Sequence, residues 1–199
     1  MAISYPLSLP QTDAIRNIDL RAINAVAYSQ SPFTFAGQAH AYSGEMWQAD
    51  ITLKPMRRSD AEQWIAWLIS LRGQYGTFLL NDPSGTSVRG TATAATITGS
   101  TGDRTVDCTV TSGDTLKAGD YLSLGTGSAT RLYKVLQDYT GTGAAADLEI
   151  WPALRADASS ASADLTSAMG TFRLASNQQN WSINEASIYG ITFGAMEAL

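Results

Sequence analysis

The change of composition near Gly85 constrains the fold of this chain more than any single motif. Three of the five tryptophans precede it, whereas residues 86–169 are rich in Thr, Ser, Ala, Gly and Asp. Aromatic, strand-like segments then return from residue 170 to the end. Similar ends around a different middle are typical of an insertion. We therefore expect one domain built from residues 1–85 and 170–199, and a second domain over residues 86–169.

Turn-forming residues are concentrated at both expected junctions, 82–87 and 156–170. In the first of these, Asp82 begins an Asp-Pro-Ser-Gly turn, where its side chain can accept a backbone hydrogen bond. The chain from residue 77 to 81 is expected to form a strand that leads into this turn. We interpret the turn as the corner between two domains rather than the rim of an active site.

Apolar and polar residues alternate over 47–55, which predicts a half-buried strand that ends at Pro55. Residues 23–29 form a weaker strand candidate. A helix is expected over 59–73, because apolar residues recur there at helical spacing. Ser59 and Glu62 have the spacing of a capping box, and Gly73 suits the left-handed residue after the helix.

The middle segment shows several short apolar alternations separated by glycine-containing turns. Such spacing predicts a small β-barrel, and about 85 residues suffice for a five-stranded barrel of the OB type. Residues 171–199 are expected to supply two further strands to the first domain. The predicted fold class is mainly β: a belt-like β-sandwich with one principal helix, plus the inserted OB-like barrel.

Composition excludes several classes of protein. The hydrophobic fraction of 44% is too high for a wholly disordered chain. The formal net charge of −5 argues against a dedicated nucleic-acid binder, and we interpret Lys54, Arg57 and Arg58 as a solvated or partner-contacting group. The sequence contains no apolar run long enough to span a membrane, and we expect no secretory signal. The single cysteine, Cys108, is expected to be a buried strand residue.

We find no catalytic constellation and expect no enzyme activity, cofactor or metal. His40 is the only histidine, lies in a polar stretch and lacks a nucleophile elbow, so we expect it to lie on the surface. Glycoside hydrolysis requires two carboxyl groups that act as a matched acid and base. No feature of this sequence identifies such a pair. The acidic candidates are Glu45, Asp50, Asp82, Asp103, Asp120, Glu149 and Glu185.

Two other features remain open to more than one interpretation. Residues 124–131 resemble a fragment of a glycine-rich phosphate loop but lack its lysine, so a hairpin turn is the preferred prediction. Tyr121, Tyr133 and Trp151 are either an exposed aromatic platform for sugars or part of the core.

The chain resembles the distal tail proteins of long-tailed bacteriophages and prophages. The resemblance lies in Trp-x-Ala-x-Ile-Thr-Leu-Lys-Pro-Met-Arg-Arg at 47–58, the helical segment 61–73, Tyr-Gly-Thr-Phe-Leu-Leu-Asn-Asp-Pro at 75–83, and the segments 118–122, 131–136 and 151–155. It covers the organisation of the whole chain. Its motifs are structural, and the family offers no catalytic residues to transfer.

This resemblance implies a ring-forming belt domain, assembled as a hexamer between tail tube and tail tip or baseplate. It implies tail tube and tail-hub proteins as partners, a location at the distal end of the virion tail after assembly in the bacterial cytoplasm, and passage of DNA through the ring without sequence-specific binding. An acidic lumen is expected from the net charge. Two other functions remain: a carbohydrate-binding tail module for host adsorption, and a hydrolase of cell-wall sugar or peptide using Asp82 and Glu149.

Overall fold

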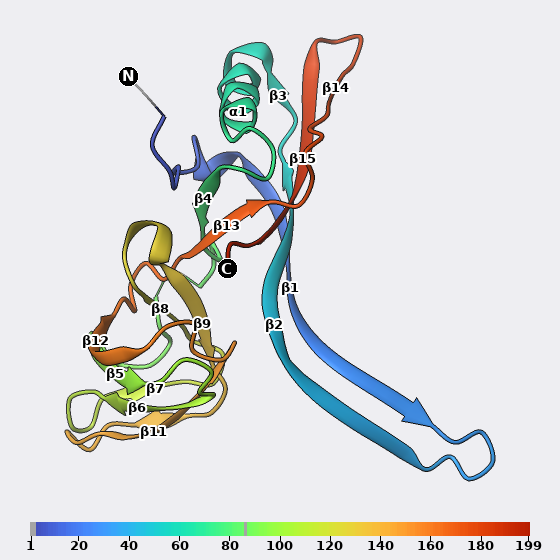
Figure 1. Ribbon diagram of the computed structural model, residues 1–199. Helices are drawn as coiled ribbons and strands as arrows, with labels where there is room; N and C mark the ends of the chain where they lie inside the picture. Colours follow the sequence, from blue (N-terminus) through green and yellow to red (C-terminus); the bar gives the residue numbers. More distant parts are fainter. Residues whose placement is uncertain (1–2, 86) are drawn as a thin grey trace.

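The computed structural model describes residues 3–85 and 87–199, and the chain is mainly β (Figure 1). The larger sheet has the strand order β1–β2–β15–β13–β4, with β14 and β3 also paired to β15, and all these pairings are antiparallel. Its strands are β1 (Ile15–Gln30), β2 (Gly37–Leu53), β3 (Met56–Arg57), β4 (Thr77–Leu80), β13 (Gly170–Leu174), β14 (Trp181–Ile183) and β15 (Ile188–Glu197). A short 3-10 turn, η1 (Thr12–Ala14), precedes β1.

Alternation correctly predicted the buried face of β2. Trp47, Ala49, Ile51 and Leu53 are buried, and the residues between them are only partly covered. The weak strand candidate at residues 23–29 was too short, because β1 runs from Ile15 to Gln30. The expectation of two C-terminal strands was also wrong, since β13, β14 and β15 all form there.

Helix α1 (Arg58–Ser70) packs against the larger sheet. The predicted capping box is wrong, because the N-cap lies two residues before Ser59. Arg57 occupies the N-cap position without a side-chain cap, and Ser59 donates to the neighbouring Asp60 carboxylate at 3.3 Å. Glu62 instead accepts from Arg58 at 3.2 Å. Gly73 does lie in the left-handed region, at φ +67°, as predicted for the chain reversal after the helix.

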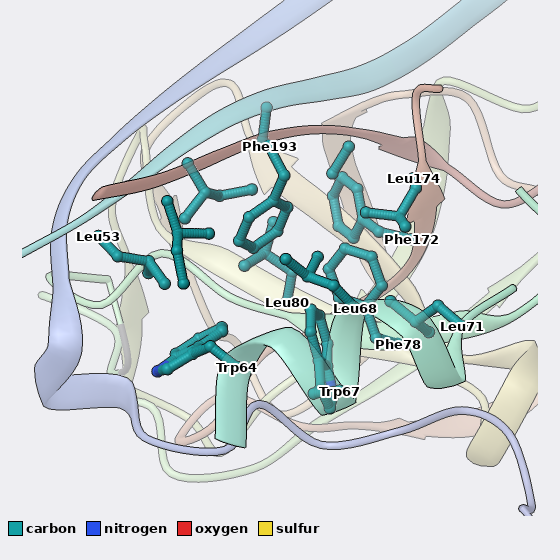
Figure 2. Close-up of a cluster of buried hydrophobic side chains, with 14 of the residues drawn as sticks. Leu53, Trp64, Trp67, Leu68, Leu71, Phe78, Leu80, Phe172, Leu174 and Phe193 are labelled. Carbon is teal, nitrogen blue, oxygen red and sulfur yellow. The ribbon is translucent and has the colours of Figure 1, made fainter. Parts of the chain in front are cut away.

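Aromatic side chains join the helix to the sheet (Figure 2). The Trp67 ring lies 5.0 Å from that of Phe78 and 5.8 Å from that of Phe193, measured between centroids. Its indole nitrogen donates to the Ser8 carbonyl at 2.9 Å, so Trp67 also secures the N-terminal segment. Because aromatic rings bury large areas, these contacts provide much of the hydrophobic stabilisation of the helix.

The middle of the chain forms a second, nearly closed barrel-like sheet with the order β12–β5–β6–β11–β9–β8. Its strands are β5 (Ala95–Gly99), β6 (Thr105–Thr109), β8 (Tyr121–Leu124), β9 (Arg131–Val135), β11 (Ala146–Trp151) and β12 (Ala158–Ala163). A bridge between Ser123 and Asp164 brings the two outer strands together. The barrel prediction is confirmed at this level, but the sheet has six strands rather than five.

Smaller elements complete the barrel. β7 (Thr115–Leu116) pairs with β10 (Tyr139–Thr140), and the 3-10 turn η2 (Gly127–Ala129) connects β8 to β9. The hairpin prediction for residues 124–131 is therefore confirmed. The turn-rich junction predicted at 156–170 is wrong in part, because β12 forms within it and pairs with β5.

Two buried clusters meet along β8 and β9. Tyr121 and Leu132 belong to the cluster under the larger sheet, whereas Leu122 and Tyr133 belong to the barrel cluster. The indole of Trp47 adds a polar contact by donating to the Leu132 carbonyl at 3.0 Å. Both faces of these two strands are thus covered.

The Asp82 turn has the predicted geometry. The Ser84 amide donates to the Asp82 carboxylate at 2.9 Å, and the Gly85 amide donates to the Asp82 carbonyl at 3.0 Å. β4 precedes this turn as expected, and the first partly buried apolar residue packed on the barrel cluster, Val88, follows it.

Replacement of Phe78 tests the aromatic layer. We expect Phe78→Ala to lower the free energy of unfolding by about 3–5 kcal/mol, because a fully buried ring leaves a cavity beneath α1. Tyr75→Ala is the control, since Tyr75 is exposed and should change stability by less than about 0.5 kcal/mol. Urea denaturation followed by tryptophan fluorescence measures both, and equal effects would contradict this packing.

Candidate assembly interface: the β1–β2 arm

A two-stranded ribbon projects from the body of the molecule (Figure 1). We call residues 24–44 the arm; it contains the distal halves of β1 and β2 and the turn between them. Every arm residue is exposed except Ser31, which is partly buried. At 3.3 Å per residue, the paired strands extend roughly 20 Å beyond the body. The arm is therefore a long regular structure whose two faces are both exposed.

The arm begins where β2 loses its second neighbour. β15 pairs with β2 only from Gln48 to Thr52, and in the described chain the arm strands pair only with each other. The register of β1 and β2 also shifts at this point, between Asn24 and Val26. Such a bulge bends and twists a ribbon, which explains why the arm departs from the sheet here.

Side chains satisfy the β2 edge at the root of the arm. Glu197, the last residue of β15, accepts a hydrogen bond from the Trp47 amide at 3.1 Å. Arg155 then donates to the Glu45 carbonyl at 2.6 Å and forms a two-pronged pair with Glu197, at 3.1 and 2.8 Å. These contacts replace the missing neighbouring strand for one further step along β2.

The Glu45 carboxylate joins the arm root to the barrel. It accepts from Arg104 at 2.7 and 2.9 Å through one oxygen, and from the Ala153 amide at 2.7 Å through the other. Trp151 adds two contacts: its indole donates to Asn24 at 2.8 Å, and its ring meets the Trp47 ring edge to face at 4.4 Å. The root is consequently fixed to the barrel, while the rest of the arm is free.

The two faces of the arm carry different side chains. Val26 and Tyr28 share one face, and the Tyr28 ring lies across Gly37, where a Cβ would approach its hydroxyl oxygen to 2.3 Å. On the other face, the rings of His40 and Tyr42 meet edge to face at 4.7 Å. Only a glycine at position 37 allows the tyrosine ring to lie flat on the ribbon.

Two phenylalanines form the tip of the arm. Phe33 and Phe35 are 91% and 74% exposed. The tip is held by the Phe35 amide donating to the Ser31 carbonyl at 3.0 Å and by Gln30 donating to the Phe35 carbonyl at 2.9 Å. Phe35 has φ +55°, a left-handed conformation that costs a bulky side chain about 1 kcal/mol or more. An ordered turn thus keeps two large apolar rings in solvent.

Charge is also missing from this surface. Residues 22–44 contain no Asp, Glu, Lys or Arg. Proteins usually protect open strand edges with charged side chains, and an isolated two-stranded hairpin is only marginally stable in water. An exposed, uncharged, aromatic ribbon with open edges has the properties of a surface that another protein covers.

A second exposed apolar surface lies on the β14–β15 hairpin, which projects from the opposite end of the larger sheet (Figure 1). Trp181, Ile183 and Ile188 are exposed there. β14 pairs only with β15 in the described chain, so its outer edge is open as well. The molecule therefore presents two apolar, strand-edged surfaces that lie far apart.

The structure disperses the carboxylates considered from sequence. Asp82 accepts from its own turn, Asp50 pairs with Arg21 on the sheet, and Glu149 accepts from Gln137 at 2.9 Å. Asp103 accepts from the Ser100 amide at 2.7 Å, and Glu185 is exposed between β14 and β15. Each of the four hydrogen-bonded carboxylates thus contacts a different protein group in its own part of the structure.

Asp120 and Glu45 differ from the others because both are buried. Asp120 accepts from the backbone amides of Arg89 and Lys117, at 2.9 and 2.8 Å, and so fixes the entry into the barrel. His40 is exposed on β2, as predicted, and stands beside Tyr42 rather than beside a nucleophile. Lys54, Arg57 and Arg58 are also exposed, and Arg58 pairs with Glu62.

The aromatic residues considered as a sugar platform take part in packing. Tyr121 and Tyr133 are buried, and Trp151 packs at the arm root. Cys108 is buried in β6, as predicted, and burial raises the pKa of its thiol to about 11. In residues 3–85 and 87–199, no three His, Cys, Asp or Glu side chains are grouped as a metal site would need.

The helices of the described chain include none long and apolar enough to cross a membrane. A scan against protein-family models and a search of curated proteins both return no match to this chain.

Sequence analysis did not detect the arm as the candidate interface. Its strands have both faces exposed, so no period-two burial pattern distinguishes them. The available signal was the uncharged stretch 22–44, which is unusual in a chain with 31 charged residues, counting 13 basic and 18 acidic. That signal becomes informative once the stretch is known to be exposed.

Glu45→Gln tests the root of the arm. Both carboxylate oxygens accept hydrogen bonds, so in either orientation the new amide group faces a donor, Arg104 or the Ala153 amide. We expect the free energy of unfolding to fall by about 2–3 kcal/mol. Glu62→Gln, in an exposed pair on α1, is the control and should change it by less than about 0.5 kcal/mol. Chemical denaturation that gives similar values for both variants would contradict the bracing role.

Thiol labelling tests the environment of Cys108. The ordinary pKa of a cysteine thiol is 9.0, and burial raises the pKa of Cys108 to about 11. Folding therefore favours the protonated thiol, and its contribution to the free energy of unfolding declines as the pH rises from about 9 to 11. We expect a maleimide to label the native protein at least a hundredfold more slowly than the guanidinium-unfolded chain in mildly alkaline solution. Equal labelling rates, measured by mass spectrometry, would show that β6 is open.

Proposed function

We propose that this chain is a structural component of the tail tip of a long-tailed bacteriophage, forming a ring that joins the tail tube to the tip or baseplate. The observation that carries the proposal is the exposed, uncharged arm with its open strand edges. Such an arm gains stability when a neighbouring copy covers it, because burial of its aromatic rings and pairing of its edges are unavailable in the isolated chain.

Ring formation requires two different surfaces on each copy. A head-to-tail contact joins one patch to another, and the series closes when the rotation between copies divides a full turn. The arm and the β14–β15 hairpin provide two apolar surfaces at distant parts of one larger sheet. This separation supports a head-to-tail ring more than a two-fold dimer, in which the same patch would contact itself.

The proposal also assigns a role to each of the two sheets. The larger sheet with α1 would be the belt domain, residues 1–85 and 170–199, and the barrel-like sheet would be an inserted OB-like domain, residues 86–169. In the ring, tail tube and tail-hub proteins would contact the two ends, and DNA would pass through a lumen made acidic by a net charge of −5 per copy. No catalytic activity or cofactor is part of the proposed role.

Changes at the arm tip test the assembly. We expect the purified chain to form particles of about six copies, seen as rings by negative-stain microscopy and weighed by native mass spectrometry. The double change Phe33→Ser and Phe35→Ser should weaken each contact by about 4 kcal/mol, since each buried phenylalanine contributes roughly 2 kcal/mol, and should leave folded monomers.

Ile69→Ser provides the matched control, because Ile69 is a large exposed apolar residue on α1, outside the arm. This variant should assemble like the unchanged protein. A wild-type chain that stays monomeric at high concentration, alone and with tail-tube protein, would contradict the proposed function. Rings that persist in the double variant would show that the arm is not the contact.

A further inference from the structure

The cavity where arm root, barrel and C-terminal residues meet has an unusual charge. It measures about 420 Å³, and Arg104, Arg131 and Arg155 are among the residues that line it. Ser43 from the arm root borders it, and Ala153 and Leu154 give it an apolar side. Three of the 13 basic residues of an acidic chain therefore surround one cavity.

The two carboxylates that pair with Arg104 and Arg155 do not line this space. Glu45 and Glu197 have side chains only 5% and 2% exposed, and neither lines the cavity. They form ion pairs with Arg104 and Arg155, whose side chains remain 55% and 15% exposed. Arg104 uses Nε and Nη2 for Glu45, so its other terminal nitrogen makes no hydrogen bond among the described residues.

Arg131 carries the uncompensated charge. Its Nη1 donates to the carbonyl oxygens of Ser128 and Thr130, at 2.8 and 3.1 Å, and it pairs with no carboxylate in the described chain. Carbonyl oxygens orient a guanidinium but do not neutralise it. Arg131 therefore contributes a guanidinium without a carboxylate partner in the described chain, next to the small apolar surface of Ala153 and Leu154.

We propose that this cavity is a binding site for an anionic group, a carboxylate or phosphate carried on a short, partly apolar ligand. Planar guanidiniums bind such groups with charge-assisted hydrogen bonds, and the volume lies within the range of small-ligand sites. Leu154 and Ala153 would contact the apolar part. The proposal is independent of ring formation, because all of these residues belong to one copy.

Calorimetric titration of the full chain tests the site with three probes at constant ionic strength. The probes are citrate, inorganic phosphate, and a short peptide with one glutamate between leucines. We expect saturable binding of one equivalent per chain for at least one probe. The glutamine analogue of the peptide should not bind, which separates charge recognition from apolar contact. Binding of the peptide alone would identify a protein carboxylate as the source, and binding of citrate or phosphate a free anion.

Changes at Arg131 locate the binding. Arg131→Gln keeps a donor for the carbonyls but removes the charge, and should weaken binding about tenfold. Arg131→Glu should abolish binding, whereas Arg131→Lys should keep much of it. Arg16→Gln is the control, since Arg16 lines a different cavity of about 300 Å³ beside Asp82. Absence of saturable binding for all three probes, or unchanged affinity in Arg131→Glu, would overturn the proposal.

Discussion

The hydrogen-bonded edge of β2 between Glu45 and Trp47 is the constraint on which the arrangement of this protein depends. β15 ends there, and without another partner the exposed backbone groups of β2 would lie against the barrel unsatisfied. Glu197 and Arg155 supply that partner, with contacts of 3.1 Å to the Trp47 amide and 2.6 Å to the Glu45 carbonyl. A buried carboxylate is costly unless it is fully hydrogen-bonded, and here each oxygen of Glu45 and Glu197 accepts from a named donor.

This junction makes the arm rigid at its root and free beyond it. The bulge sets where the ribbon bends, and Trp151 and Arg104 fix the bent segment against the barrel. A preorganised arm loses less conformational entropy on binding than a flexible loop of the same length. The exposed phenylalanines at its tip therefore lie on a support whose direction is set within the single chain. The same support gives the arginine cavity its shape, since Arg104 and Arg155 act in both.

The sequence predicted the elements in which buried and exposed residues alternate regularly. Prediction failed where a strand is exposed on both faces or contains only small residues. Trp47, Ala49, Ile51 and Leu53 alternate because one face of β2 is covered there. The same strand shows no pattern from Gly37 to Gly44, where both faces are exposed. β12 was missed for another reason: its sequence, Ala-Ser-Ser-Ala-Ser-Ala, contains only small residues, which are equally frequent in turns. The candidate interface and the arginine cavity depend on which segments meet in space, and no local pattern in this sequence encodes that.

The position of the barrel explains how a long segment can lie within the larger sheet without disrupting it. β4 and β13, which flank residues 86–169, are antiparallel neighbours, with Thr77 opposite Arg173 and Leu80 opposite Gly170. The chain thus leaves and re-enters the sheet at adjacent points, as a hairpin would, and the pairing of the two strands closes the segment between them. A change inside the barrel would then affect the arm only through the few residues at the junction. Arg104, Trp151, Ala153 and Arg155 carry that connection together with the contact of Trp47 on Leu132, so the orientation of the arm depends on the barrel through these residues.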